Sequence, residues 1–447
     1  MKFDEYFKLK DLTLNITNYC NMKECCGDYC SYCFENHRNK DMMKEEQFKQ
    51  IIDKCYHNHI RNYGDETLLV NLFGGEPFAN WKLIEYALKY SKEQNYNIEY
   101  GVTTNLIHLT DHMIDVIEEY ELGLLVSIDG IRDIHNRNRS NSYDLVKNNI
   151  QRLVERGLKH LIEVRMTVMP SDVDYLLESI QSIVDMGIVN IAPVPVSDTK
   201  WLEPDYERFK FNLSNVWDWI IQIYNNNENK QNITIKFIED YLEKVLVFSL
   251  NDTIKHCLAG KNTNCSIGVN GEIYPCHQRH TIENNNSKLL FGNFFDDDIK
   301  DIDFNNNETK APFNCKECIA FSTCQGGCPS ENLTQNGDSN IMNETQCRLT
   351  QIMVEVALKY QYEIMQSTNI RSKRLNTIKV NMELMNYLIM EVLTKDFTSK
   401  EYNLALISFY EKMIDYKASL LPQFEDIINN IITELKNINN YMEQQND

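Results

Sequence analysis

The spacing of cysteines in the second half of the chain is the feature that most restricts how this sequence can fold. The densest run places four thiols within fourteen residues, separated by two, five and three residues. Soft thiolate ligands at this density select zinc or iron–sulfur clusters. The sequence therefore predicts a loop-rich, metal-binding module over residues 256–350. The whole group comprises Cys257, Cys276, Cys315, Cys318, Cys324, Cys328 and Cys347.

A second group of cysteines lies near the N-terminus. Tyr32 lies inside its last cysteine pair and Phe34 directly follows that pair. Because the two groups are far apart in the sequence, we expect two separate metal sites. The members of this second group are Cys20, Cys25, Cys26, Cys30 and Cys33.

Composition limits the class of protein. The chain has 447 residues, 43% of them hydrophobic, which is enough for two or three domains with buried cores. The sequence shows no export signal and no apolar run of membrane-spanning length, so we expect a cytoplasmic protein without a membrane partner. In that reducing compartment, fourteen cysteines favour metal ligation over disulfides. The net charge of −20 argues against a nucleic-acid partner, because binding phosphates needs a basic face.

The first two hundred residues alternate β-like runs with segments long enough for a crossover helix. This pattern predicts an α/β fold, a partial (β/α)6 version of the TIM barrel, with its chemistry at the carboxyl ends of the strands. The predicted strands are 12–17, 68–73, 98–103, 123–128, 161–168 and 189–194.

We expect four regions in the chain. Residues 1–200 form the partial barrel, 201–255 two bridging helices, 256–350 the cysteine-rich module, and 351–447 a C-terminal domain of three or four amphipathic helices. The apolar stripes of that last domain indicate core packing, with peptide docking or dimerisation as the alternative.

Three N-terminal motifs resemble the radical S-adenosyl-L-methionine (SAM) superfamily. They are Asn15 to Asn21, Cys30-Ser31-Tyr32-Cys33-Phe34 and Gly74-Gly75-Glu76-Pro77, while the later cysteines resemble the SPASM auxiliary-cluster extension. The resemblance covers residues 12–350. It implies an oxidoreductase with a 4Fe-4S cluster held by three cysteines, whose fourth iron is chelated by SAM. In such enzymes the cofactor supplies a 5′-deoxyadenosyl radical that removes hydrogen from the substrate.

The sequence offers two candidate cysteines for one ligand of this first cluster. Members of the superfamily usually space their cysteines C-x3-C-x2-C directly after the first strand. The strand-end context selects Cys20, whereas the spacing selects Cys26, and Cys30 and Cys33 are common to both assignments. We favour Cys20, with residues 24–29 as an insertion in the loop.

The resemblance also implies which residues bind SAM. The turn from Gly74 to Pro77 would hold the methionyl amino group, Ser127 the ribose or amino-acid part, and Arg139 the carboxylate. Asn105 and Arg165 are weaker candidates, for which a structural hydrogen bond is the alternative. The full implied set is Gly74, Gly75, Glu76, Pro77, Asn105, Ser127, Asp129, Arg139 and Arg165.

The cysteine-rich module would hold two further 4Fe-4S clusters, giving three in all. The resemblance implies that the first of these two auxiliary clusters takes Cys257, Cys276 and Cys328, with Cys265 as a plausible fourth ligand. If Cys265 does not ligate, that cluster is left open to a substrate thiolate. The second would take Cys315, Cys318, Cys324 and Cys347. Tetrahedral zinc is the structural alternative for this module.

Enzymes with this extension mostly act on peptides or proteins. Sulfatase maturases carry an aspartate base after the second auxiliary cysteine, where this chain has His277. Histidine can also move protons near neutral pH, so His277 is the candidate catalytic residue, with simple packing as the alternative. The segments 274–278 and 290–293 look more like the thioether-forming maturases.

We therefore expect an enzyme that installs thioether crosslinks in a cysteine-containing ribosomal peptide. The alternatives are a formylglycine-generating sulfatase maturase, a carbon–carbon peptide cyclase, or a non-catalytic cluster-binding or zinc-binding protein. The expected partners are the peptide and a reductant such as flavodoxin or ferredoxin. Since about a dozen residues precede the first predicted strand, we expect leader recognition by a separate leader-binding protein, by the barrel itself or by the C-terminal helices.

Overall fold

The structure is a computed structural model. Some parts of the chain lie outside the residues that the structure describes, namely the expected second bridging helix, Cys315 and nearly all of the expected C-terminal helical domain. The described residues are 1–35, 39–225, 234–235, 257, 259–282, 289–302, 304, 318, 320, 324, 326–366, 429, 432–433 and 436–437.

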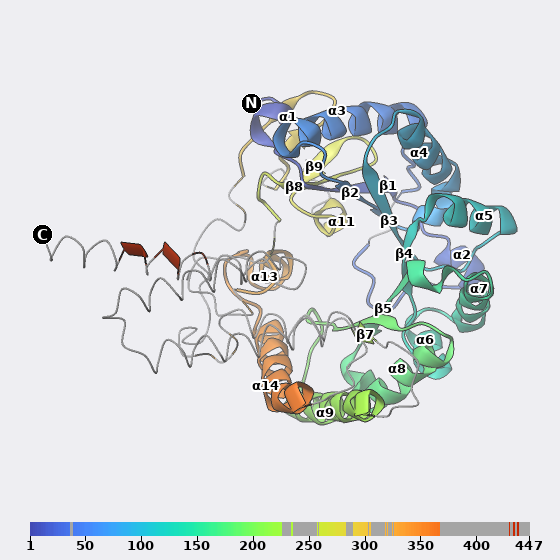
Figure 1. The fold of residues 1–447 in the computed structure, drawn as a ribbon, viewed down its shortest axis with the longest axis vertical. Coiled ribbons are helices and arrows are strands. Elements are labelled where there is room, and N and C mark those ends of the chain that lie inside the picture. The colour runs from blue at the N-terminus through green and yellow to red at the C-terminus, as the bar shows by residue number, and fades with distance from the viewer. Residues whose placement is uncertain are drawn as a thin grey trace, which may run out of the picture.

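A curved sheet of parallel strands forms the centre of the molecule, with the helices that follow the strands on its outer side (Figure 1). All six predicted strands are present, paired in chain order, so the predicted α/β partial barrel is confirmed. A short β7 (Thr234–Ile235) pairs with the last of them. The six are β1 (Asp11–Thr17), β2 (Leu68–Gly74), β3 (Ile98–Thr104), β4 (Gly123–Ser127), β5 (Ile162–Val168) and β6 (Asn190–Pro195).

Amphipathic helices cover the outside of the sheet. In α7 (Tyr143–Glu155), for example, Val146, Ile150 and Leu153 recur at helical spacing and are buried. The other helices of the barrel are α1 (Phe3–Tyr6), α2 (Met22–Cys26), α3 (Glu45–Tyr63), η1 (Pro77–Asn80), α4 (Trp81–Glu93), α5 (Asp111–Tyr120), α6 (Arg132–Asn138), η2 (Leu158–Leu161), η3 (Pro170–Tyr175), α8 (Leu176–Asp185) and α9 (Glu203–Asn225). Among the described helices, none combines the length and the apolar character that crossing a membrane requires.

The cysteine-rich module continues the barrel sheet beyond β1. Strand β8 (Asn264–Ile267) pairs in parallel with β1, and β9 (Glu272–Tyr274), β10 (Gly292–Asn293) and β11 (Asp298–Ile299) follow as antiparallel strands. The module also contains the short helices α11 (Arg279–Ile282) and α13 (Pro329–Asn336). This shared sheet fixes the module beside the open carboxyl end of the barrel.

Helix α14 (Glu344–Gln366) anchors the far end of the module. It packs against α9, where Trp217 and Tyr360 stack with 5.5 Å between ring centroids and the Tyr360 hydroxyl donates to Asp218 (2.7 Å). The helix contains residues 350 and 351, between which we expected the module to end and the C-terminal domain to begin. The module is therefore tied to the barrel through both β8 and α14.

Candidate active site

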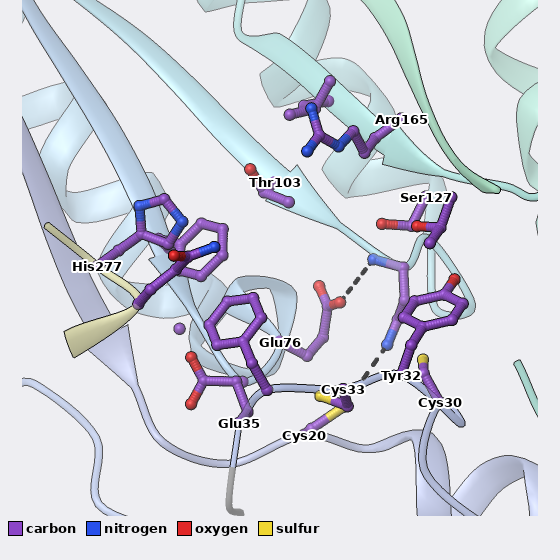
Figure 2. Close-up of a pocket in the computed structure, with 18 of the residues that line it drawn as sticks. Cys20, Cys30, Tyr32, Cys33, Glu35, Glu76, Thr103, Ser127, Arg165 and His277 are labelled. Atoms are coloured by element: carbon purple, nitrogen blue, oxygen red, sulfur yellow. Dashed lines mark hydrogen bonds between the residues drawn. The ribbon is translucent and has the colours of Figure 1, made fainter. Parts of the chain in front are cut away.

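One cavity of about 480 Å³ lies at the carboxyl ends of the barrel strands. Because alternate strand residues point to the same face, strands β1, β2, β3 and β5 line it with Thr13, Asn71, Thr103 and Arg165. Residues of the cysteine-rich module complete its wall, namely His277, Gln278 and Glu331. Figure 2 shows the three labelled cysteines at one end of this cavity and Arg165 at the other.

Three N-terminal thiols converge on the cavity. Cys20 follows β1 and is buried, while Cys30 and Cys33 come from the loop beyond α2. Burial raises the pKa of all three thiols, that of Cys33 to about 12, and neighbouring Cys30 raises the pKa of Cys20 and Cys33 further. Cys26 lies on α2 and is not part of the cavity lining. These thiols stay protonated until a metal ionises them, and three cysteine sulfurs that face one cavity are the donor set of an iron–sulfur cluster with one iron site left open.

The glycines of the turn after β2 support the loop that carries Cys20. A Cβ at Gly74 would lie 2.0 Å from the Thr17 carbonyl oxygen, and one at Gly75 would lie 2.5 Å from the Tyr19 carbonyl oxygen. The Gly75 amide donates to Thr17 (2.9 Å). Both glycines therefore let two backbone segments touch, and Gly74, Gly75 and the following glutamate also line the cavity.

Glu76 is buried at the base of the cavity. Its carboxylate accepts hydrogen bonds from the Thr104 hydroxyl (2.7 Å), the Asn105 amide (2.7 Å) and the Phe78 amide (3.0 Å). Burial raises its pKa to about 7, although these hydrogen bonds oppose the rise. Carboxylate oxygens have four lone-pair sites, so Glu76 can accept a further hydrogen bond from a ligand. Pro77 begins η1 and is buried.

Asn105 links the strand-three turn to the cysteine loop. Its side-chain amide donates to the Asn21 oxygen (3.0 Å) and lies 4.0 Å from the Cys20 sulfur. Its own oxygen accepts from the Ile107 amide (3.1 Å). The structural hydrogen bonds that we considered as the alternative are therefore present.

Asp129 and Arg139 form a buried ion pair beside Cys30. The Arg139 Nε donates to Asp129 (3.0 Å), one terminal nitrogen lies 3.8 Å from the Cys30 sulfur, and the other lies 3.4 Å from the Thr167 hydroxyl. Asp129 also accepts from the Thr167 amide (3.0 Å) and from the Tyr32 hydroxyl. The guanidinium that we expected to clamp the SAM carboxylate is engaged with protein groups at all three nitrogens.

At the opposite end of the cavity, Arg165 is exposed to the lumen and surrounded elsewhere by protein, so that burial lowers its pKa. Within the described part of the chain its guanidinium has no hydrogen bond or ion pair. Ser127 faces the cavity from the neighbouring position on β4.

His277 packs against two aromatic rings of the cavity wall. Its ring centroid lies 4.3 Å from that of Phe73 and 6.1 Å from that of Phe34. Burial, and to a smaller extent the nearby Arg165 charge, lower its pKa to about 4. The imidazole is therefore neutral near pH 7.

Glu331 is a cavity residue that the sequence reasoning missed. It lies on α13, three positions after Cys328, and accepts a hydrogen bond from the Ser197 hydroxyl. Burial raises its pKa, and Asp198 raises it further. A glutamate near a cysteine carries no spacing signal of its own, so only the fold could place it here.

The structure brings together the three cysteines of one module set and two cysteines of the other. Cys257, Cys276 and Cys328 are close enough that the first two raise the pKa of Cys328, which burial brings to about 12. In the other set, the Gln351 amide lies 3.4 Å from the Cys318 sulfur and 3.6 Å from that of Cys347. Cys324 contacts the Met342 sulfur at 3.5 Å.

Cys265 lies apart from the first of these sets. It is fully buried in β8, in register with Leu12 of β1, on the opposite face from the cavity residue Thr13. Its thiol raises the pKa of Cys55 on α3, which covers the outside of the sheet. The plausible fourth ligand is thus a core residue behind the sheet, and we do not carry it forward as a ligand.

Comparison with known proteins identifies relatives of this chain. Residues 14–183 match the family model described as the Radical SAM superfamily. The radical SAM cyclopropyl synthase TigE of Paramaledivibacter caminithermalis is 23% identical over 380 residues, which cover 80% of this chain and 75% of that protein. A cysteine-type anaerobic sulfatase-maturating enzyme of Clostridium perfringens is 23% identical over 344 residues, covering 69% and 85%.

Solved structures share the fold. The structure of anSMEcpe with bound AdoMet and the Cp18Cys peptide superposes with a TM-score of 0.62 at 19% identity, covering 81% of this chain and 99% of that chain. The structure of Streptococcus suis SuiB bound to its precursor peptide SuiA gives 0.53 at 16% identity, covering 77% of each chain.

Proposed function

Since this chain belongs to the radical SAM superfamily, we propose that it is a peptide maturase that installs thioether crosslinks in a cysteine-containing ribosomal peptide. It is an enzyme of the SPASM-containing type, and its family implies one 4Fe-4S cluster and SAM. The observation that carries the proposal is the shared cavity: three N-terminal cysteines line one end, and residues of the cysteine-rich module line its wall. A substrate in this cavity would lie between two groups of metal-binding thiols.

Cys20, Cys30 and Cys33 would hold the cluster that binds SAM. When bound, the cluster and SAM supply the radical that removes a hydrogen atom from the substrate. Glu76 would accept a hydrogen bond from the amino group of SAM, and Ser127 would contact its ribose or amino-acid part. The turn after β2, which carries Glu76, is shaped by Gly74, Gly75 and Pro77.

Three of the implied SAM contacts receive other roles. Asp129 and Arg139 hold one another and the cysteine loop. Arg165 lies at the end of the cavity away from the cysteines, and its guanidinium makes no hydrogen bond or ion pair with the described residues, so we assign it to the peptide substrate. A guanidinium there can hold a peptide carbonyl or carboxylate.

The module cysteines would hold two auxiliary clusters. Cys257, Cys276 and Cys328 form a set of three, because Cys265 lies behind the sheet. This set is left open to one outside sulfur ligand, and the thiol of a peptide cysteine is the group that a thioether-forming enzyme must bind. Cys318, Cys324 and Cys347 would hold the second cluster together with Cys315.

The partners follow from this chemistry. Relatives of the same fold are known with the Cp18Cys peptide and with a precursor peptide bound, which supports a peptide substrate. Reduction of the clusters needs a protein such as flavodoxin or ferredoxin.

A formylglycine-generating sulfatase maturase is the second candidate. The relative from Clostridium perfringens favours it, since the match covers 85% of that enzyme. The relative TigE, a cyclopropyl synthase, favours carbon–carbon bond formation as a third possibility within the same family. His277, neutral and packed against aromatic rings, is the residue that separates this chain from the aspartate expected of a sulfatase maturase.

Anaerobic coexpression with a cysteine-containing peptide encoded beside the gene tests the proposal. We expect loss of two hydrogens from the peptide for each crosslink and a matching loss of thiols that iodoacetamide can alkylate. A variant with Cys30→Ala and Cys33→Ala should leave the peptide unchanged. Formation of 5′-deoxyadenosine with an unmodified peptide would contradict thioether chemistry on that peptide, and a sulfatase-derived peptide would then be tested.

A further inference from the structure

The guanidinium of Arg139 lies between a buried carboxylate and a cluster cysteine. One of its terminal nitrogens lies 3.8 Å from the Cys30 sulfur, while its Nε donates to Asp129 at 3.0 Å. The guanidinium carbon lies 5.2 Å from the ring centroid of Tyr32, which lies between Cys30 and Cys33 in the sequence. Arg139 is only 7% exposed and Asp129 is fully buried.

Every nitrogen of this guanidinium is oriented by a neighbour. Thr167 contacts the second terminal nitrogen with its hydroxyl, and its backbone amide holds the other oxygen of Asp129. The loop is also fixed through its backbone, since the Ser31 amide donates to the Asn138 carbonyl (2.9 Å). The arginine is therefore held in place before any ligand binds.

From these contacts we propose that Arg139 is a positioning residue that donates a hydrogen bond to the Cys30 thiolate and raises the reduction potential of the SAM-binding cluster. This inference rests on the proposed assignment of Cys30 as a cluster ligand. Reduction adds negative charge to a cluster, and a hydrogen-bond donor or a positive charge at a ligating sulfur stabilises that charge. In a site sheltered from water the effect is larger than at a surface.

The carboxylate of Asp129 balances the charge of Arg139. A buried arginine without a partner is costly, and the carboxylate compensates its charge while fixing its direction. The compensation also limits how far Arg139 raises the potential. Removing the negative charge of Asp129 should therefore shift the potential in the opposite direction from removing the positive charge of Arg139.

The neighbouring cysteine offers a comparison within the same site. The Asn105 amide lies 4.0 Å from the Cys20 sulfur and is neutral, whereas Arg139 approaches Cys30 with a full positive charge. Hydrogen bonds from charged donors are about twice as strong as those between neutral groups. Of these two contacts to the cluster cysteines, the one from Arg139 should have the larger effect on the reduction potential.

The test is a reductive titration of the reconstituted enzyme, followed by electron paramagnetic resonance with and without SAM. The cluster in question is the one whose spectrum changes when SAM is added. We expect Arg139→Gln to lower its potential, Arg139→Lys to lower it less, and Asp129→Asn to raise it. The potentials of the other clusters should not change, and the dissociation constant of SAM should stay within about threefold of the wild-type value.

Arg137→Gln is the matched control. Arg137 lies on α6, two residues before Arg139, but its guanidinium pairs with Asp172 and its side chain is 52% exposed. This variant should keep the wild-type potential.

The same measurements can also contradict the proposal. An unchanged potential together with SAM binding weakened tenfold or more would show that Arg139 clamps the cofactor carboxylate, and would overturn the proposal. If Arg139→Gln fails to retain iron, Asp129→Asn decides, because only charge tuning predicts a rise. A wild-type enzyme without any SAM-responsive cluster would instead contradict the proposed function.

Discussion

The imidazole of His277 packs against the ring of Phe73, with 4.3 Å between the ring centroids. Aromatic pairs at this separation contribute mainly by packing. The same burial lowers the pKa of His277 to about 4, so the residue is neutral across the pH range in which peptide thiols begin to ionise. His277 therefore combines a packing role with weak basicity.

Substitution of His277 should separate these roles. We expect His277→Phe to retain peptide crosslinking within about tenfold, because it keeps the aromatic wall, whereas His277→Ala should lose far more by opening the cavity. Crosslinked peptide per 5′-deoxyadenosine, measured by mass spectrometry, checks this. A loss of about a hundredfold or more in His277→Phe, with unchanged 5′-deoxyadenosine, would instead identify His277 as the proton acceptor.

The choice between Cys20 and Cys26 can be tested with a matched pair of variants. Cys20 lines the cavity with Cys30 and Cys33, while Cys26 lies on α2 outside the lining. We expect Cys20→Ala to lose one cluster's iron and all 5′-deoxyadenosine formation, and Cys26→Ala to retain both. Iron analysis and chromatography measure the two outcomes, and the reverse pattern would assign the ligand to Cys26.

Cys265 should behave as a core residue. Because it packs on the face of the sheet opposite the cavity, Cys265→Ala should keep the wild-type iron content and cost about 1 kcal/mol of stability from the lost sulfur contacts. Cys276→Ala, the control within the same module, should lose one auxiliary cluster. An equal loss of iron in both variants would restore Cys265 as a ligand.

The sequence predicted the barrel well because most of its strands alternate apolar and polar residues, as β1 does with Leu12, Leu14 and Ile16. The predicted strand 98–103 became Ile98–Thr104, and the predicted 189–194 became Asn190–Pro195. Local patterns of this kind depend on neighbours in the chain, so they can be read without knowing the fold.

Contacts between distant segments could not be predicted in the same way. The joining of β8 to β1 decides which face Cys265 occupies, and its register is not encoded in the cysteine spacing. The pairing of Arg139 with Asp129 was also missed, although both residues had been singled out, because a motif shows which residues matter and not which partner each one takes.

Arg165 should influence the peptide more than the cofactor. It faces the end of the cavity away from the cysteines and lies near Glu331 of α13. We expect Arg165→Gln to raise the KM for the peptide by about tenfold, the effect of losing one charged hydrogen bond, while the dissociation constant of SAM is unchanged. The Arg165→Lys variant keeps the charge but loses the planar guanidinium, so its KM for the peptide should lie between those of the wild type and of Arg165→Gln. Weakened SAM binding with an unchanged peptide KM would return Arg165 to the cofactor site.

The binding of SAM should depend on pH through Glu76. Burial raises the pKa of this carboxyl group to about 7, and only its ionised form is a full acceptor for the amino group of SAM. Binding to the ionised form lowers that pKa, so affinity should increase as the pH rises through 7 and level off above it. Between pH 6 and pH 8 we expect about a tenfold decrease in the dissociation constant, measured anaerobically on the reconstituted enzyme. Glu76→Gln should bind SAM more weakly and without this dependence, and a wild-type affinity that stays flat over the same range would show that Glu76 is already ionised at pH 6.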